Sequence, residues 1–153
     1  MEELTKIIEY IVLRSTDLKN CYTDEKNAPV EFGCVFCQNE DEYEKITNKI
    51  KIYGKAVEDT ISGFTYLLDA PIKTVSGPLR LVKIRKPDPK RNERGDADFN
   101  TDYQTFKKKY ANDPKFELIK RDTFEYLRLS DLNFDVMACF SNIPKSKDLG
   151  IIL

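Results

Sequence analysis

The sequence predicts an α+β fold in which an N-terminal helix precedes two tandem β-α-β-β-β units. One observation is a weak internal repeat: at an offset of 60 residues, Phe64-x-Tyr66-Leu67 recurs as Phe124-x-Tyr126-Leu127. The other is that each copy follows a stretch with apolar residues at helical spacing. These residues are Tyr43, Ile46 and Ile50 in the first copy and Tyr103, Phe106 and Tyr110 in the second. A shared order and phase indicates one supersecondary unit used twice.

The chain opens with an amphipathic pattern that predicts a helix covering one side of the fold. Its apolar positions are Leu4, Ile7, Ile8, Ile11 and Val12. Residues 20–29 are polar and end in a proline, which is typical of a connecting loop. Residues 1–29 are therefore expected to form an N-terminal helix and loop.

Residues 30–86 are expected to form the first unit. The apolar run at 30–37 predicts a strand, and Asn39 followed by acidic residues predicts a helix start. Gly54 is the expected C-cap of that helix. Three strands are predicted after it, at residues 55–60, 64–68 and 79–85, with a connector at 70–77.

A charged, proline-bearing linker at residues 87–95 leads into the second unit, residues 96–141. The same order of elements is predicted there: a strand at 96–99, a helix at 102–111, and strands at 116–121, 124–130 and 134–141. Residues 142–153 form a tail. At 153 residues, the chain fits one compact domain.

Composition limits the expected partners. The 25 basic and 26 acidic side chains nearly cancel, so no overall field recruits nucleic acid or an anionic membrane. No stretch approaches the ~20 apolar residues of a membrane span, and no basic segment leads into an apolar run at the start. We therefore expect a cytoplasmic protein with a small-molecule ligand, no nucleic-acid or membrane partner, and a homodimer as a further option.

The cysteines and the absence of histidine exclude several kinds of site. Four scattered cysteines predict reduced thiols rather than a disulfide framework. Cys34 and Cys37 lie three apart on a predicted strand and so face opposite ways, which prevents them from sharing a zinc ion. Without histidine, a Ser-His-Asp or Cys-His device is excluded, as is a histidine-ligated metal.

The two units and their linker resemble the vicinal oxygen chelate superfamily, which includes glyoxalase I, extradiol dioxygenases and bleomycin-resistance proteins. The segments SGPLRLVKIRKPDP at 76–89 and RGDADF at 94–99 are similar to those of a poorly characterised bacterial branch, predicted to bind metal and likened to dioxygenases. The resemblance implies paired curved, antiparallel-rich sheets that form a cleft. It also implies a metal held by His and Glu from the opening and last strands of each unit.

The resemblance places those ligand positions at residues that depart from the pattern. They are Glu31 and Arg85 in the first unit, Asp96 in the second, and a position near Phe140 or Ser141. An arginine supplies a fixed cation where a metal should lie. We therefore expect no metal centre of the family type and no cofactor.

Alternation along two strands predicts a polar cluster in the cleft. Asp96 and Asp98 share one strand face, with carboxylates ~6 to 7 Å apart, and Lys83 and Arg85 share a face of another strand. If these faces meet, the groups could form structural ion pairs, bind a polar ligand, or hold a hard cation. Burial without partners would raise the carboxylate pKa and make the group a candidate general acid or base. A neighbouring arginine would instead lower that pKa, which argues against proton transfer.

We predict that the cleft binds a small polar molecule through Glu31, Lys83, Arg85, Asp96 and Asp98, without the family's metal centre. The alternative is a lyase, isomerase or dioxygenase relative in which Asp96 and Asp98 hold Mg, Mn or Ca. No catalytic residue is assigned. Tyr66 and Tyr126 are expected in the core, with the cleft as the other option.

Overall fold

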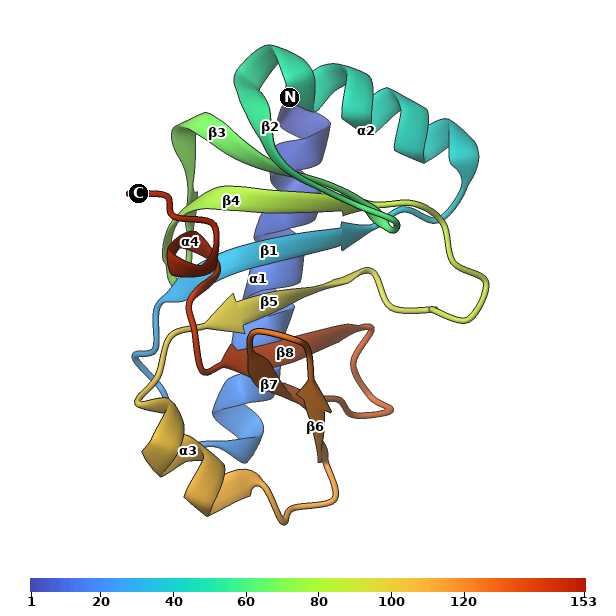
Figure 1. The fold of residues 1–153 in the computed structure, drawn as a ribbon. Helices are drawn as coiled ribbons and strands as arrows, with labels where there is room; N and C mark the ends of the chain where they lie inside the picture. Colours follow the sequence, from blue (N-terminus) through green and yellow to red (C-terminus); the bar gives the residue numbers. More distant parts are fainter.

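A computed structural model describes residues 1–153 and contains one eight-stranded mixed sheet (Figure 1). The strand order is β2-β3-β4-β1-β5-β8-β7-β6. The strands are β1 (Val30–Phe36), β2 (Gly54–Thr60), β3 (Gly63–Thr74), β4 (Gly77–Arg85), β5 (Gly95–Phe99), β6 (Phe116–Lys120), β7 (Glu125–Leu129) and β8 (Val136–Ser141). The helices are α1 (Glu2–Tyr22), α2 (Glu40–Tyr53), α3 (Tyr103–Tyr110) and α4 (Lys145–Asp148).

The predicted pair of β-α-β-β-β units is confirmed by the pairing of the strands. In the first unit β1 pairs in parallel with β4, and in the second β5 pairs in parallel with β8. The two opening strands, β1 and β5, pair antiparallel at the centre, with Cys34 opposite Asp96. The strand order is therefore symmetric about the β1–β5 pair, and the two half-sheets join edge to edge into one sheet.

Helix α1 covers one face of this sheet (Figure 1) and supplies much of the core. Its apolar stripe, including Ile8, Ile11 and Val12, is at most 2% exposed and packs against β1, β5 and β8. The helix runs three residues into the segment predicted as a loop. Lys19, fully buried near its end, donates to the Asn20 side chain and the Glu25 carbonyl, so its ammonium group keeps polar partners.

The structure differs from the sequence prediction at Gly54 and in the connector at 70–77. Gly54 follows α2, but its φ of −172° is extended and it begins β2. A Cβ there would lie 2.5 Å from the Leu67 carbonyl oxygen, so glycine is needed for the close approach of β2 to β3. The predicted connector at 70–77 is mostly strand, because β3 and β4 resume pairing at Ile72, after an irregularity in register, and pair up to Thr74 and Gly77.

The repeated aromatic residues do not occupy equivalent positions. Tyr66 lies in the core and is 1% exposed, whereas Tyr126 lines the opposite face of the sheet. Tyr66 pairs with the core residue Val82 in the first unit, whereas Tyr126 pairs with Ser141, which lines the cleft, in the second. The matched residues are therefore out of register. The repeat thus predicted the order of elements correctly but not which side chains face the cleft. None of the four helices has the length and apolar character to span a bilayer.

Candidate functional site

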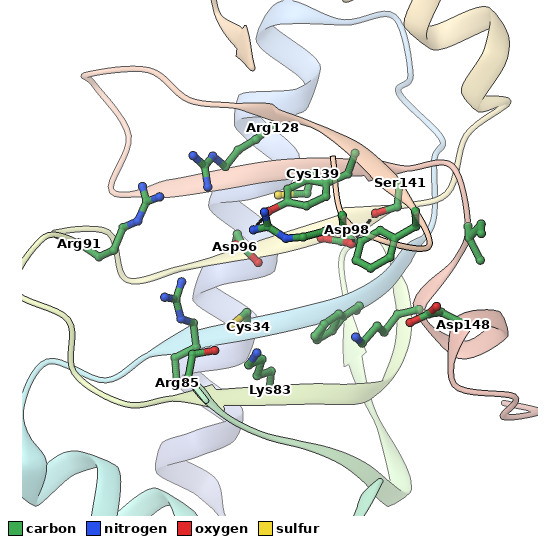
Figure 2. Close-up of a pocket in the computed structure, with 17 residues that line it drawn as sticks. Cys34, Lys83, Arg85, Arg91, Asp96, Asp98, Arg128, Cys139, Ser141 and Asp148 are labelled. Atoms are coloured by element: carbon green, nitrogen blue, oxygen red, sulfur yellow. Dashed lines mark hydrogen bonds between the residues drawn. The ribbon is translucent and has the colours of Figure 1, made fainter. Parts of the chain in front are cut away.

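A cleft of about 300 Å³ lies on the sheet face that α1 leaves open (Figure 2). Its lining alternates along the strands with core residues: Ile84 and Ala97 pack toward the helices, whereas Lys83, Arg85 and Asp96 line the cleft. Both units contribute. The polar lining consists of Cys34, Ser62, Lys83, Arg85, Arg91, Asp96, Asp98, Arg121, Tyr126, Arg128, Cys139, Ser141, Lys145 and Asp148.

Asp96 and Asp98 lie at the centre of the cleft, as the alternation on their strand predicts. An oxygen of each lies within 4.8 Å of the other and of the Cys139 sulfur. The Ser141 hydroxyl donates to Asp98 at 3.1 Å. Burial, and next the charge of Asp98, raises the pKa of Asp96 to about 7. Burial likewise raises the pKa of Asp98 to about 6, although the hydrogen bond from Ser141 opposes this.

The expected ion pairs between these carboxylates and neighbouring cations are not formed. The chain's salt bridges within 4 Å include neither Asp96 nor Asp98, although Lys83 and Arg85 line the same cleft. Arg85 and Arg128 do oppose the rise in the pKa of Asp96, but burial is the larger effect. Desolvation outweighs the attraction, because the basic side chains are held by other groups.

Three arginines, Arg85, Arg91 and Arg128, lie on one side of Asp96, toward one end of the cleft (Figure 2). The Arg85 guanidinium lies 4.7 Å from the centre of the Phe36 ring and 3.9 Å from an Asp88 oxygen. Arg128, on β7, contacts Glu117 at 2.8 Å, and Arg91 lies 3.6 Å from Glu93. Each arginine is thus held in place by a partner outside the central pair of aspartates.

The lining carries more positive than negative groups. Its cations are Lys83, Arg85, Arg91, Arg121, Arg128 and Lys145, and its carboxylates are Asp96, Asp98 and Asp148. Lys83 donates to the Thr60 hydroxyl at 2.8 Å, and burial lowers its pKa. Lys145 bonds to Glu58 at 2.9 Å. Such a surplus of cations favours an anionic ligand.

Glu31 was predicted to line the cleft, but the structure places it elsewhere. One carboxylate oxygen accepts from the Ser146 backbone N–H at 2.9 Å, and the other accepts from Asn100 at 3.1 Å. An irregularity in the β1–β5 register between Val30 and Phe32 leaves Phe32 in the cleft. Glu31 therefore fixes α4 at the end of the cleft instead of binding a ligand there.

Sequence reasoning missed several lining residues. Arg128 could have been found, because it lies two residues after Tyr126 on a predicted strand and shares its face. Arg91, in the linker, carried no periodic signal. Cys34 and Cys139 both line the cleft with free thiols, and burial raises the pKa of each well above its usual range. Cys37 packs in the core on the other face, as its spacing from Cys34 predicts.

A metal centre of the kind implied by the resemblance does not fit these residues. That centre draws ligands from both units, but the first unit presents Lys83 and Arg85 to the cleft from its last strand. Asp96, Asp98 and Cys139 form the chain's one group of three metal-ligating side chains, and all three belong to the second unit. A cation there would face repulsion from Lys83 and Arg85.

Comparison with known proteins identifies the fold. No protein-family model matches the chain, and no curated protein matches it. The solved structure of protein EC4020, a structural-genomics target, matches with a TM-score of 0.75, covering 97% of this chain and 91% of its own, at 11% sequence identity. The chain shares its fold with protein EC4020.

A second solved structure is a glyoxalase/bleomycin resistance protein/dioxygenase superfamily member from Vibrio splendidus 12B01. It matches with a TM-score of 0.42 over 74% of this chain and 97% of its own, at 8% identity. Because one scaffold hosts unrelated chemistries, the likeness to EC4020 describes architecture, and activity must be argued from the cleft.

Proposed function

We propose that this protein binds a small anionic molecule in its central cleft, without a family-type metal centre. The observation that carries the proposal is the convergence of Arg85, Arg91 and Arg128 at one end of the cleft. A guanidinium presents its donors in a planar fork that suits carboxylates and phosphates. Two or three guanidinium groups that point into the same part of the cleft would bind a carboxylate or a phosphate.

The size and walls of the cleft support a metabolite-sized ligand. A volume of about 300 Å³ lies at the small end of known ligand pockets. Phe32, Phe124 and Tyr126 supply apolar surface beside the charged groups. Such sites combine apolar walls with a few fixed polar groups. The free thiols suit a reducing compartment, and we propose a cytoplasmic location.

The alternative is a divalent-metal enzyme, for which the grouping of Asp96, Asp98 and Cys139 is the supporting observation. Its carboxylate oxygens suit Mg or Mn, but its thiol does not. Lys83 and Arg85 oppose a cation at that point, so we favour the anion.

The test is binding of simple anions to purified protein by calorimetry, with succinate and inorganic phosphate as probes. We expect at least one probe to bind, and Arg85→Gln or Arg128→Gln to weaken it about tenfold, equivalent to ~1.4 kcal/mol. Lys90→Gln, an exposed cation in the linker, is the matched control and should leave affinity unchanged. Failure of both probes to bind, or equal binding by the arginine variants, would overturn the proposal.

A further inference from the structure

Asp96 and Asp98 form an unneutralised acidic pair inside a cleft dominated by cations. Asp98 accepts a hydrogen bond from the Ser141 hydroxyl and interacts with the Cys139 thiol, whereas no side chain donates to Asp96. Both are half-buried and their oxygens lie close together. Placing two carboxylates in such a position is costly unless a partner binds them.

A second group in the cleft also lacks a partner. Cys34 is 5% exposed and lines the cleft, and its thiol makes no hydrogen bond. In the sheet it lies between Asp96 on β5 and Lys83 on β4. The floor of the cleft beside Asp96 therefore presents both an unpaired carboxylate and an unpaired thiol to whatever occupies it.

The arginines gather beside Asp96, whereas the cation that acts on Asp98 is Lys145, which is bonded to Glu58. Arg85, Arg91 and Arg128 surround one side of Asp96, whereas Asp98 and Ser141 lie on its other side (Figure 2). The arginines do not neutralise the aspartates, because Phe36, Glu93 and Glu117 hold them. A single ligand that carries a positive group a few ångströms from a negative group would bind the aspartates and the arginines at once.

Resting on the proposed function, we infer that the bound anion is the carboxylate of a free amino acid, whose ammonium group binds Asp96 and Asp98 while its carboxylate binds the arginines. The ammonium offers three donors for two carboxylates. The carboxylate can accept two parallel bonds from a guanidinium. Phe32, Phe124 and Tyr126 would then contact the amino-acid side chain.

The experiment screens the twenty standard L-amino acids for thermal stabilisation of the full chain, then measures the best one by calorimetry beside its deaminated analogue. We expect the amino acid to bind at least tenfold more tightly than the analogue. Asp98→Asn should reduce that ratio to threefold or less, and Arg85→Gln should weaken both compounds. Asp96→Asn is the second variant should Asp98→Asn fail to fold.

The outcomes separate this inference from the proposal beneath it. Equal or tighter binding of the deaminated analogue, succinate or phosphate overturns the amino-acid inference and leaves anion binding standing. Absence of binding by every amino acid and every simple anion overturns both. Stoichiometric Mn²⁺ or Mg²⁺ that is lost in Asp96→Asn and displaces the amino acid also overturns the inference, because the metal would then be the missing cation.

Discussion

Asp96 and Asp98 owe their raised pKa values to their place on β5 and not to a shortage of basic residues nearby. Burial disfavours the ionised form of each, and each carboxylate opposes the ionisation of the other. Lys83 and Arg85 come from β4, and Arg128 from β7, but none forms a salt bridge with them. The pair is thus a proton-binding site at neutral pH.

This predicts a pH-dependent effect of Asp96→Asn on stability. The carboxyl ionises near pH 3.9 in the unfolded chain and at about 7 in the folded protein. Between these values the folded state binds more protons, so this residue's favourable contribution, complete below pH 3.9, is lost as pH rises through 7. Asparagine cannot ionise. We therefore expect Asp96→Asn to stabilise the protein at pH 8, by on the order of 1 kcal/mol after solvent screening, and to have little effect at pH 4.

Urea unfolding at pH 4 and pH 8 measures this effect. Asp122→Asn, at an exposed position, is the control and should show no such difference. An Asp96→Asn variant that is less stable than the wild-type protein at pH 8 would contradict the role given to Asp96.

At the scale of elements, α4 and its flanks close one end of the cleft. Ser146 donates its backbone N–H and its hydroxyl to Glu31, and Lys145 bonds to Glu58 on β2. Lys145 also lies 5.4 Å from the centre of the Phe32 ring. A four-residue helix with no buried residue of its own depends on these contacts.

We expect Glu31→Gln to loosen α4, because an amide cannot accept from both Ser146 and Asn100 as the carboxylate does. Loss of a hydrogen bond to a charged acceptor costs about 1.5–3 kcal/mol. Amide hydrogen exchange followed by mass spectrometry should speed up in residues 143–149 and remain unchanged in α2. Lys147→Gln, exposed on the same helix, is the control, and unchanged exchange in Glu31→Gln would show that other contacts hold the helix.

The helices and strands could be predicted where local sequence patterns determine them. Only some of the residues that line the cleft could be predicted. Alternation on β4 and β5 identified Lys83, Arg85, Asp96 and Asp98 as cleft residues. The fate of Glu31 depended on a register irregularity in β1, which a single sequence does not reveal. The absence of ion pairs depended on which acidic groups hold the arginines in space, and the partner of Arg128, Glu117, lies on another strand.

For the whole molecule, the junction of the two halves depends on Gly95. A Cβ there would lie 2.1 Å from the Cys34 carbonyl oxygen and 2.7 Å from a methyl group of Ile11. Because the first of these atoms belongs to the backbone of β1, it cannot move aside easily. The close approach of β1 and β5 therefore requires glycine at this point.

We expect Gly95→Ala to lower the free energy of unfolding by about 1–3 kcal/mol, as for other overpacked sites. Gly33→Ala, on the same pair of strands, is the matched control. Its Cβ would meet a Leu79 side-chain methyl at 3.1 Å, so it should cost less. Urea unfolding of both variants measures the difference, and a smaller loss in Gly95→Ala than in Gly33→Ala would contradict this account.

The pairing of β1 with β5 brings the cleft residues of the two halves together. The first half brings Lys83 and Arg85 to the cleft, and the second brings Asp96, Asp98 and Arg128. Only the two halves together supply the complete set of charged groups, because Lys83 and Arg85 are absent from the half that carries both aspartates and Arg128. A ligand bound to all of these groups would therefore link the two half-sheets across the β1–β5 junction.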